Sequence, residues 1–465
     1  MSEFDVAVIN GTVITPDGAA RRDVLIRGET IAAIEPSGPR RAATRVIDAE
    51  GRLVLPGGVD VHTHFLIGFM GQKSVYDFHT GSAAALRGGT TTIVDFALQR
   101  RGRTLMDGIK HRRVQADQRV VADYGLHLIV TDVNEASLAE IPAVIAAGVT
   151  SFKVYMVYEK EQLRVPDDAL RTLLAAAGRA GILVGVHAEN AEMIDRAIER
   201  CLAAGEHAPR FHALTRPPEA EAEAIRRAIR LAGEAKAPLY IFHLSAGDGL
   251  AAVEAAQARG QPVFAETCPH YLALTEAVYD RADAHHYVMS PPLRSAQDQA
   301  KLWQGLKTGS LAAVASDDAS YSAEAKKASS FEAIANGVPG AEARLPVLFT
   351  LGVDSGRLSL SEFAEVWSGR PARLFGLAPR KGALIPGADA DLVIVDTNRR
   401  ERLTPSSHYG PIGYMPYDGM EVTGLPELTL RRGHIMVERG TFLGTEGSGQ
   451  FLARQLPDTR LQPAR

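Results

Sequence analysis

Short apolar runs and longer amphipathic stretches alternate eight times along the middle of the chain. Apolar runs of this length predict buried β-strands, and the Ala-, Glu- and Arg-rich stretches between them predict helices with one apolar face. Two such helices are predicted at 167–179 and 219–234, the second directly after Pro217-Pro218, which suits a helix start. The predicted strands are 59–64, 90–96, 124–130, 151–157, 183–189, 239–245, 263–267 and 311–317.

Eight successive strand-then-helix units predict an α/β fold, a (β/α)8 TIM-like barrel that occupies residues 56–379. An open sheet of eight strands is the alternative. Such a sheet would not bring its first, fifth, sixth and eighth strands around one point, and those are the strands that end in potential metal ligands.

The two ends of the chain carry short strands separated by turn residues. Asn10-Gly11, Gly28-Glu29-Thr30 and Arg432-Gly433-His434 each lie between two strand-like runs and predict hairpins. We expect residues 1–55 and 380–440 to form one small β-sandwich domain, and residues 441–465 to form a C-terminal extension that contacts another copy of the chain. The predicted strands are 5–9, 13–15, 24–27, 31–34, 390–395, 428–431 and 435–438.

Composition and charge argue against nucleic-acid and membrane partners. The 465 residues are 46% hydrophobic and 23% charged with a net charge of −4, so no basic surface for nucleic acid is expected. No apolar run approaches the roughly 20 residues that span a bilayer, and the N-terminus does not resemble a signal peptide. The 2 cysteines cannot form a disulfide framework and suit a reducing compartment. We therefore expect a cytoplasmic protein with a small-molecule partner.

Five potential metal ligands stand at the carboxyl ends of predicted barrel strands. His62 and His64 are two residues apart, so they share one face of a strand and can reach one ion. Three further strands run toward His187, His243 and Asp317. Active sites of (β/α)8 barrels form at this end of the strands, so the pattern predicts a metal centre. The alternative for each histidine is an ordinary buried or surface role.

Lys153 interrupts an apolar run that otherwise predicts a strand buried in the barrel. Lysine is seldom buried without a partner, and an ammonium would repel a metal ion. Burial and nearby cations favour loss of its proton, and the free amine can react with CO₂ to form a carbamate that bridges two cations. The alternative is a lysine that reaches solvent at a strand end. Two bridged cations lower the pKa of a shared water, and Asp317 could accept its proton, which favours hydrolysis at a carbonyl. Imidazole and carboxylate ligands suit Zn²⁺, with Mn²⁺ and Co²⁺ as alternatives.

Short motifs spread along nearly the whole chain support this interpretation. They are His62-Thr63-His64, Ser151-Phe152-Lys153 and the stretches 186–190, 216–219, 268–272, 289–294, 336–338, 379–382 and 419–424. Together they resemble the dihydropyrimidinase/D-hydantoinase family of the amidohydrolase superfamily. The resemblance implies a hydrolase that opens 5,6-dihydropyrimidines or 5-substituted hydantoins to N-carbamoyl amino acids, and a homotetramer or homodimer.

The resemblance also implies a role for each site residue. Tyr158 would bind the developing oxyanion, backbone groups of Ser290 and Asn336 would hold the cyclic amide, and Asp317 would move the proton. Two divalent cations are implied, one held by His62, His64 and Asp317 and the other by His187 and His243, with Lys153 as N6-carboxylysine between them.

Several positions keep alternatives open. Asp318 stands where the family commonly has histidine, and it is either a solvated loop residue or part of the proton relay. Leu66 replaces the arginine by which dihydroorotases hold an anionic ring, which disfavours such a substrate. The apolar stretch 65–70 is expected to line the pocket for the exocyclic group of the substrate. An allantoinase-like enzyme, a cyclic-imide hydrolase and a non-catalytic scaffold protein are the alternative functions.

Overall fold

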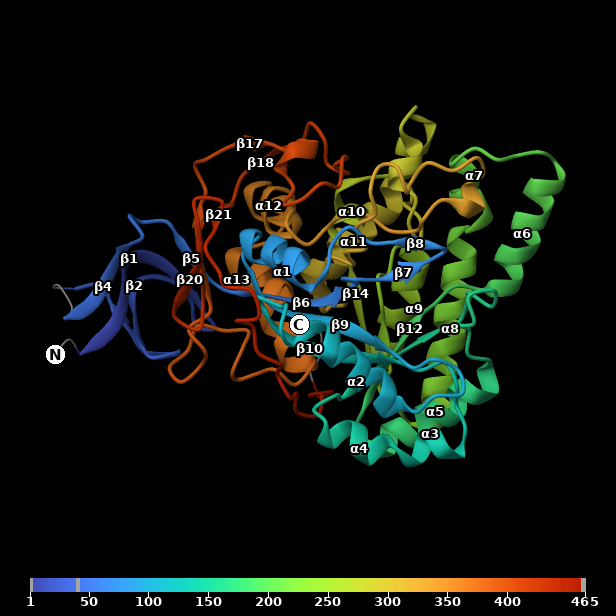
Figure 1. The fold of residues 1–465 in the computed structure, drawn as a ribbon, viewed down its shortest axis with the longest axis horizontal. Helices are drawn as coiled ribbons and strands as arrows, with labels where there is room; N and C mark the ends of the chain where they lie inside the picture. The colour runs from blue at the N-terminus through green and yellow to red at the C-terminus, as the bar shows by residue number, and fades with distance from the viewer. Residues whose placement is uncertain (1–2, 39–41, 461–465) are drawn as a thin grey trace.

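The computed structural model describes residues 3–38 and 42–460. Its centre is an eight-stranded parallel sheet in the order β15-β14-β13-β12-β11-β10-β9-β6, with helices packed around it (Figure 1). The sheet closes where Thr63 bridges Asp318 in parallel and the His64 N–H donates to the Asp318 carbonyl at 2.8 Å. The predicted (β/α)8 barrel is therefore confirmed. Its strands are β6 (Gly58–Thr63), β9 (Thr90–Leu98), β10 (Asp123–Ile129), β11 (Ser151–Tyr155), β12 (Leu183–His187), β13 (Leu239–Ile241), β14 (Val263–Thr267) and β15 (Ala313–Val314).

The helices of the barrel follow the strands in sequence. The two helices predicted from apolar periodicity are present as α5 (Asp167–Ala180) and α8 (Pro218–Ala235). No helix of the described part of the chain is long and apolar enough to cross a bilayer. Other helices around the sheet are α1 (Phe78–Arg87), α2 (Leu105–Ala116), α4 (Ile141–Ala146), α6 (Ala191–Ala203), α7 (Arg210–Thr215), α9 (Gly247–Ala258), α10 (Pro269–Ala273), α11 (Ala296–Thr308) and α12 (Arg344–Leu348).

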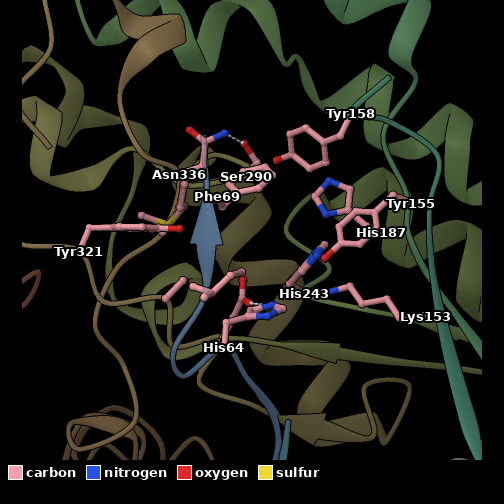
Figure 2. A pocket seen from close by; sticks show the side chains of 15 residues that line it. His64, Phe69, Lys153, Tyr155, Tyr158, His187, His243, Ser290, Tyr321 and Asn336 are labelled. Carbon is pink, nitrogen blue, oxygen red and sulfur yellow. Dashed lines mark hydrogen bonds and ion pairs between the residues drawn. The ribbon is translucent and has the colours of Figure 1, made fainter. Parts of the chain in front are cut away.

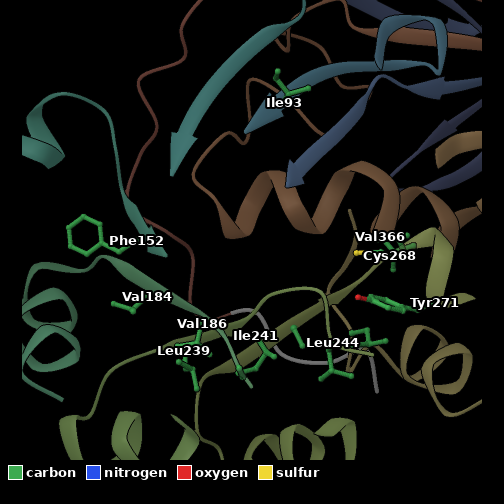
Figure 3. Close-up of a cluster of buried hydrophobic side chains, with 14 of the residues drawn as sticks. Ile93, Phe152, Val184, Val186, Leu239, Ile241, Leu244, Cys268, Tyr271 and Val366 are labelled. Carbon is green, nitrogen blue, oxygen red and sulfur yellow. The ribbon is translucent and has the colours of Figure 1, made fainter. Parts of the chain in front are cut away.

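Alternate residues of the barrel strands enter two different cores. Phe152, Val184 and Val186 belong to the large core between the strands and the helices (Figure 3), whereas Tyr155 and Phe242 belong to the core inside the barrel. This alternation follows from the two-residue repeat of a β-strand. It places every second side chain of β11, Lys153 included, inside the barrel.

One large sheet joins the two ends of the chain beside the barrel. Its order is β21-β20-β19-β16-β5-β1-β2-β3, with β4 paired to β1. The exact boundaries of the predicted small domain stay a prediction. The strands are β1 (Phe4–Thr15), β2 (Gly18–Arg27), β3 (Thr30–Pro36), β4 (Ala43–Asp48), β5 (Leu53–Pro56), β16 (Leu392–Asp396), β19 (Leu425–Arg431), β20 (His434–Glu438) and β21 (Thr441–Phe442).

The hairpin predicted at Asn10-Gly11 is wrong. β1 continues through both residues and only shifts its register against β2 between Val8 and Gly11, which is a bulge. Asn10 takes a φ of 60°, and a Cβ on Gly11 would lie 2.5 Å from the Val54 side chain. A bulge and a turn both use Asn and Gly, so the local sequence did not distinguish them.

Part of the C-terminal extension packs against the barrel of its own chain. The N–H of Leu452 donates to the Tyr124 carbonyl at 2.7 Å, and the buried Arg454 guanidinium donates to the Ser151 hydroxyl at 2.8 Å. A contact between copies through residues 441–465 stays a prediction.

Lys381, within one of the motifs noted in the sequence, ties the barrel to the terminal sheet. Its ammonium lies 2.6 Å from Asp123 on β10, 2.9 Å from Asp389 and 2.8 Å from Asp391. These three buried carboxylates have the spacing of a cation site, but the lysine already supplies the positive charge. We therefore interpret the cluster as structural.

Candidate metal centre and substrate pocket

Six side chains predicted as metal ligands meet inside the barrel at the carboxyl ends of its strands. His62 Nε2 lies 3.1 Å from His64 Nε2, 2.8 Å from Lys153 Nζ and 3.1 Å from Asp317 Oδ1. The rings of His187 and His243 stand with their centroids 4.5 Å apart, and the His243 ring lies 5.3 Å from that of His62. His62, His243 and Asp317 offer ligand atoms within 4.8 Å of one another. Nitrogen and carboxylate donors converging in this way fit divalent cations.

Buried acidic residues behind the histidines fix which ring nitrogen faces the centre. Glu266 contacts His62 Nδ1 and also accepts a hydrogen bond from the Tyr240 hydroxyl at 2.8 Å, so His62 turns its Nε2 inward. Glu189 lies 2.7 Å from His187 Nε2 and pairs with Arg216 at 2.6 Å. That contact leaves His187 Nδ1 available as the ligand. Carboxylates in such positions orient imidazole ligands in metalloproteins.

Burial controls the charge of the centre. It lowers the pKa of His62, His64, His187 and His243, which keeps these imidazoles in the neutral form that binds metals. Burial also lowers the pKa of Lys153 to about 8. The same burial acts to raise the pKa of Asp317, but contacts with His64, His243 and Lys153 hold that pKa below its ordinary value. The centre therefore combines an ionised carboxylate with four neutral imidazoles and a lysine that loses its proton more easily than an ordinary lysine.

Three of the site residues have left-handed backbone conformations. The φ angles are 70° at Tyr158, 39° at His243 and 48° at Asp317. Non-glycine residues seldom adopt such angles, and the surrounding structure has to stabilise them. β13 and β15 end at Ile241 and Val314, earlier than the sequence predicts, and His243 and Asp317 lie in the loops that follow them.

The side of the pocket opposite the metal ligands is formed by Tyr158, Ser290 and Asn336, which we call the substrate wall (Figure 2). The Asn336 amide donates to the Ser290 hydroxyl at 3.1 Å, and Tyr158 lines the pocket beside both side chains. Burial raises the pKa of Tyr158 to about 12, so its hydroxyl keeps a proton to donate at neutral pH. Within the described part of the chain, no hydrogen bond involves the backbone N–H or C=O of Ser290 or Asn336. These groups are available to a ligand.

His212 is a buried residue behind this wall that the sequence analysis did not single out. It is 3% exposed, and its Nε2 lies 2.8 Å from the Met289 carbonyl and 3.3 Å from the Ser290 hydroxyl. His212 stands on α7 and Arg216 directly after the end of that helix, and no local periodicity marked either residue. Both prove to be buried.

Asp318 fits neither alternative drawn from the sequence. It is 1% exposed, and it is absent from the residues that line the pocket. Its carboxylate accepts hydrogen bonds from the N–H groups of Gly340 at 2.8 Å and Ala341 at 3.0 Å, and from the Ser320 hydroxyl at 2.7 Å. Burial raises its pKa to about 6. Asp318 therefore anchors the loop at 340–341.

The fold and the site together define a class: a (β/α)8-barrel hydrolase with potential metal ligands at the carboxyl ends of its strands. The amidohydrolase family model matches residues 53–436, and the chain belongs to that family. It is 42% identical to the D-phenylhydantoinase of Escherichia coli O1:K1 / APEC over 455 residues, 97% of this chain and 98% of that one. The chain is accordingly a hydrolase that acts on cyclic amides.

Solved structures agree with this assignment. The dihydropyrimidinase of Brevibacillus agri NCHU1002 superposes with a TM-score of 0.95 at 40% identity, covering 97% of this chain and 98% of that one. The D-hydantoinase of Bacillus sp. AR9 gives a TM-score of 0.94 at 40% identity, covering 97% of this chain and 99% of that one. The similarity therefore extends over both the barrel and the terminal sheet.

Proposed function

We propose that the chain hydrolyses the ring amide of 5-substituted hydantoins and 5,6-dihydropyrimidines to give N-carbamoyl amino acids. One observation carries the proposal. The buried metal-ligand groups form one side of the pocket, and Tyr158, Ser290 and Asn336 form the opposite side. The named relatives act on rings of this kind, and such a ring presents alternating C=O and N–H groups along one edge.

The ligand set supports a centre of two divalent cations. When bound, the cations would polarise the ring carbonyl and lower the pKa of a water between them. His62, His64 and Asp317 would hold one, His187 and His243 the other, and Lys153, as N6-carboxylysine, would bridge them. Zn²⁺ suits these donors best, with Mn²⁺ and Co²⁺ as alternatives.

The chain's own residues would orient the ring and move the proton. Backbone groups of Ser290 and Asn336 would bind the amide edge, and the protonated Tyr158 hydroxyl would donate to the oxygen that becomes negative. The ionised Asp317 carboxylate would accept the proton of the attacking water and return it to the leaving ring nitrogen. A low pKa keeps this carboxylate ionised at neutral pH.

The exocyclic substituent of the ring has a neighbouring space, lined by apolar side chains next to the metal pocket and by charged ones such as Arg100 and Glu161. The segment that forms the short strands β7 (Gly68–Phe69) and β8 (Gln72–Lys73) lines a neighbouring cavity of about 820 Å³. Ile67, Phe69 and Tyr155 face both this cavity and the pocket of the metal ligands. This arrangement favours hydantoins with bulky apolar groups at position 5.

The test is ring opening of dihydrouracil, hydantoin, 5-phenylhydantoin and allantoin, with the metal content measured on the same sample. The protein would be reconstituted with Zn²⁺ and bicarbonate, and Lys153→Ala would serve as the control that removes the bridging group. We expect turnover of the first three compounds, most efficiently of 5-phenylhydantoin, with about two metals per chain. Turnover of allantoin alone, or full activity of Lys153→Ala with two metals, would contradict the proposal.

A further inference from the structure

Lys326 is a buried lysine that the catalytic scheme does not use. Its side chain is fully buried, and no ion pair with a carboxylate is present among the described residues. Its ammonium donates instead to three backbone carbonyls, those of Val288 at 2.6 Å, Ala335 at 2.7 Å and Gly337 at 2.8 Å. Lysine is seldom buried in this way without a reason.

The three carbonyls favour the charged form of the side chain. Each is an acceptor, and only an ammonium has three N–H donors to satisfy them all. Burial acts in the opposite direction and lowers the pKa of Lys326. The three carbonyl dipoles point at the ammonium and compensate for the missing counter-ion. Removal of the amine would leave the carbonyls of Ala335 and Gly337 buried without a donor.

The carbonyls belong to the two segments that form the substrate wall. Val288 precedes Ser290 by two residues, and Ala335 and Gly337 stand on either side of Asn336. The Gly337 N–H also donates to the Val288 carbonyl at 3.1 Å, so the two segments already touch at this point. Lys326 binds carbonyls of both segments and is not among the residues that line the pocket, whereas Ser290 and Asn336 line it (Figure 2).

The segment that carries Lys326 begins at the proposed proton acceptor. From Asp317 the chain passes Ala319 and Tyr321, which line the pocket, and then forms a turn in which the Lys326 N–H donates to the Ser322 carbonyl at 3.1 Å. One short stretch of chain, residues 317–326, therefore connects the metal centre to the 288–290 and 335–337 segments.

We propose that Lys326 is a positioning residue that sets the distance between the 288–290 and 335–337 segments, and with it the fit of the amide edge of the ring. This inference rests on the proposed function. Loss of the Lys326 amine should therefore weaken binding of the ring itself, whatever group the ring carries at position 5. The cavity for that group is lined by other segments. The metal ligands do not contact Lys326, so metal content should be unaffected.

The experiment compares Lys326→Met and Lys326→Gln with the control Lys327→Met in the zinc- and bicarbonate-loaded protein. Lys327 is the exposed neighbour, paired with Glu324 at 2.7 Å. We expect Lys326→Met to raise KM about tenfold for both hydantoin and 5-phenylhydantoin while kcat changes by less than about threefold. Glutamine keeps two N–H donors, so its KM should rise less. The control should match the wild type.

Hydrogen–deuterium exchange supplies a readout that does not depend on turnover. Exchange at 288–290 and 335–337 should accelerate in both Lys326 variants and stay unchanged in Lys327→Met. If Lys326→Met does not fold, the glutamine variant carries the same comparison. Wild-type KM values or wild-type exchange in a folded Lys326 variant would overturn the positioning role alone. Absence of turnover of every cyclic amide by the wild type would overturn the proposed function, and the positioning role with it.

Discussion

Replacement of Lys153 by methionine tests whether burial lowers the pKa of the amine at the metal centre. Lys153 is 1% exposed, and burial lowers its pKa from 10.5 to about 8. Methionine is unbranched and uncharged, so Lys153→Met removes the ionisable group while still filling most of its space. Metal-free protein is the appropriate sample, because no cation then alters the charge of the site.

The size of the effect follows from the pKa difference. A fall from 10.5 to about 8 corresponds to about 3 kcal/mol at 1.36 kcal/mol per unit. The unfolded chain binds more protons than the folded one between these two values, so this contribution to stability rises with pH across that window. The cost of burying the ammonium is complete below pH 8 and disappears above pH 10.5. At pH 7 the neutral amine is about 10% of the population, against about 0.03% for an ordinary lysine.

The assay is urea unfolding of the metal-free wild type and Lys153→Met at about pH 7.5 and pH 10.5, bracketing the window set by the two pKa values. The free energy of unfolding of the wild type should rise by about 3 kcal/mol relative to the variant between these values. The exposed Lys160 provides the control Lys160→Met, which should follow the wild type. If wild type and Lys153→Met show the same pH dependence, burial does not lower the pKa of the Lys153 amine, and the argument for carbamate formation loses its basis.

Three further substitutions test other parts of the site. Tyr158→Phe should lower kcat by about 10²–10³-fold with two metals retained, because it removes one donor to the developing oxyanion. Tyr155→Phe is the control. An equal loss of kcat in both variants would contradict the oxyanion role of Tyr158. Glu266→Gln should weaken metal affinity about 10–100-fold in competition with a chelator, because His62 loses the carboxylate that orients it; unchanged affinity would refute that role. Asp318→Asn should lower the free energy of unfolding by about 1–3 kcal/mol with KM for hydantoin unchanged, because it weakens the hydrogen bonds to the 340–341 loop. A change in KM with an unchanged free energy of unfolding would instead place Asp318 in the reaction.

Local sequence determined the elements that repeat or carry strong chemistry. The alternation of apolar runs and amphipathic stretches predicted the barrel, because two-residue and 3.6-residue periodicities are properties of the chain itself. The positions of His62, His187 and His243 at strand ends predicted that their side chains would meet, since a parallel barrel brings all carboxyl ends of its strands to one edge. Lys153 stood out because a cation inside an apolar run requires a partner or altered chemistry.

Tertiary structure alone decided the features that depend on which side chains face one another. The sequence could not show that Asn10-Gly11 forms a bulge, because a bulge is defined by the pairing of β1 with β2. Nor could it show that Asp318 turns away from the pocket to bind two backbone amides, or that Lys326 fastens the substrate wall. In each case the partner groups belong to other segments of the chain. Only the folded structure brings them into contact.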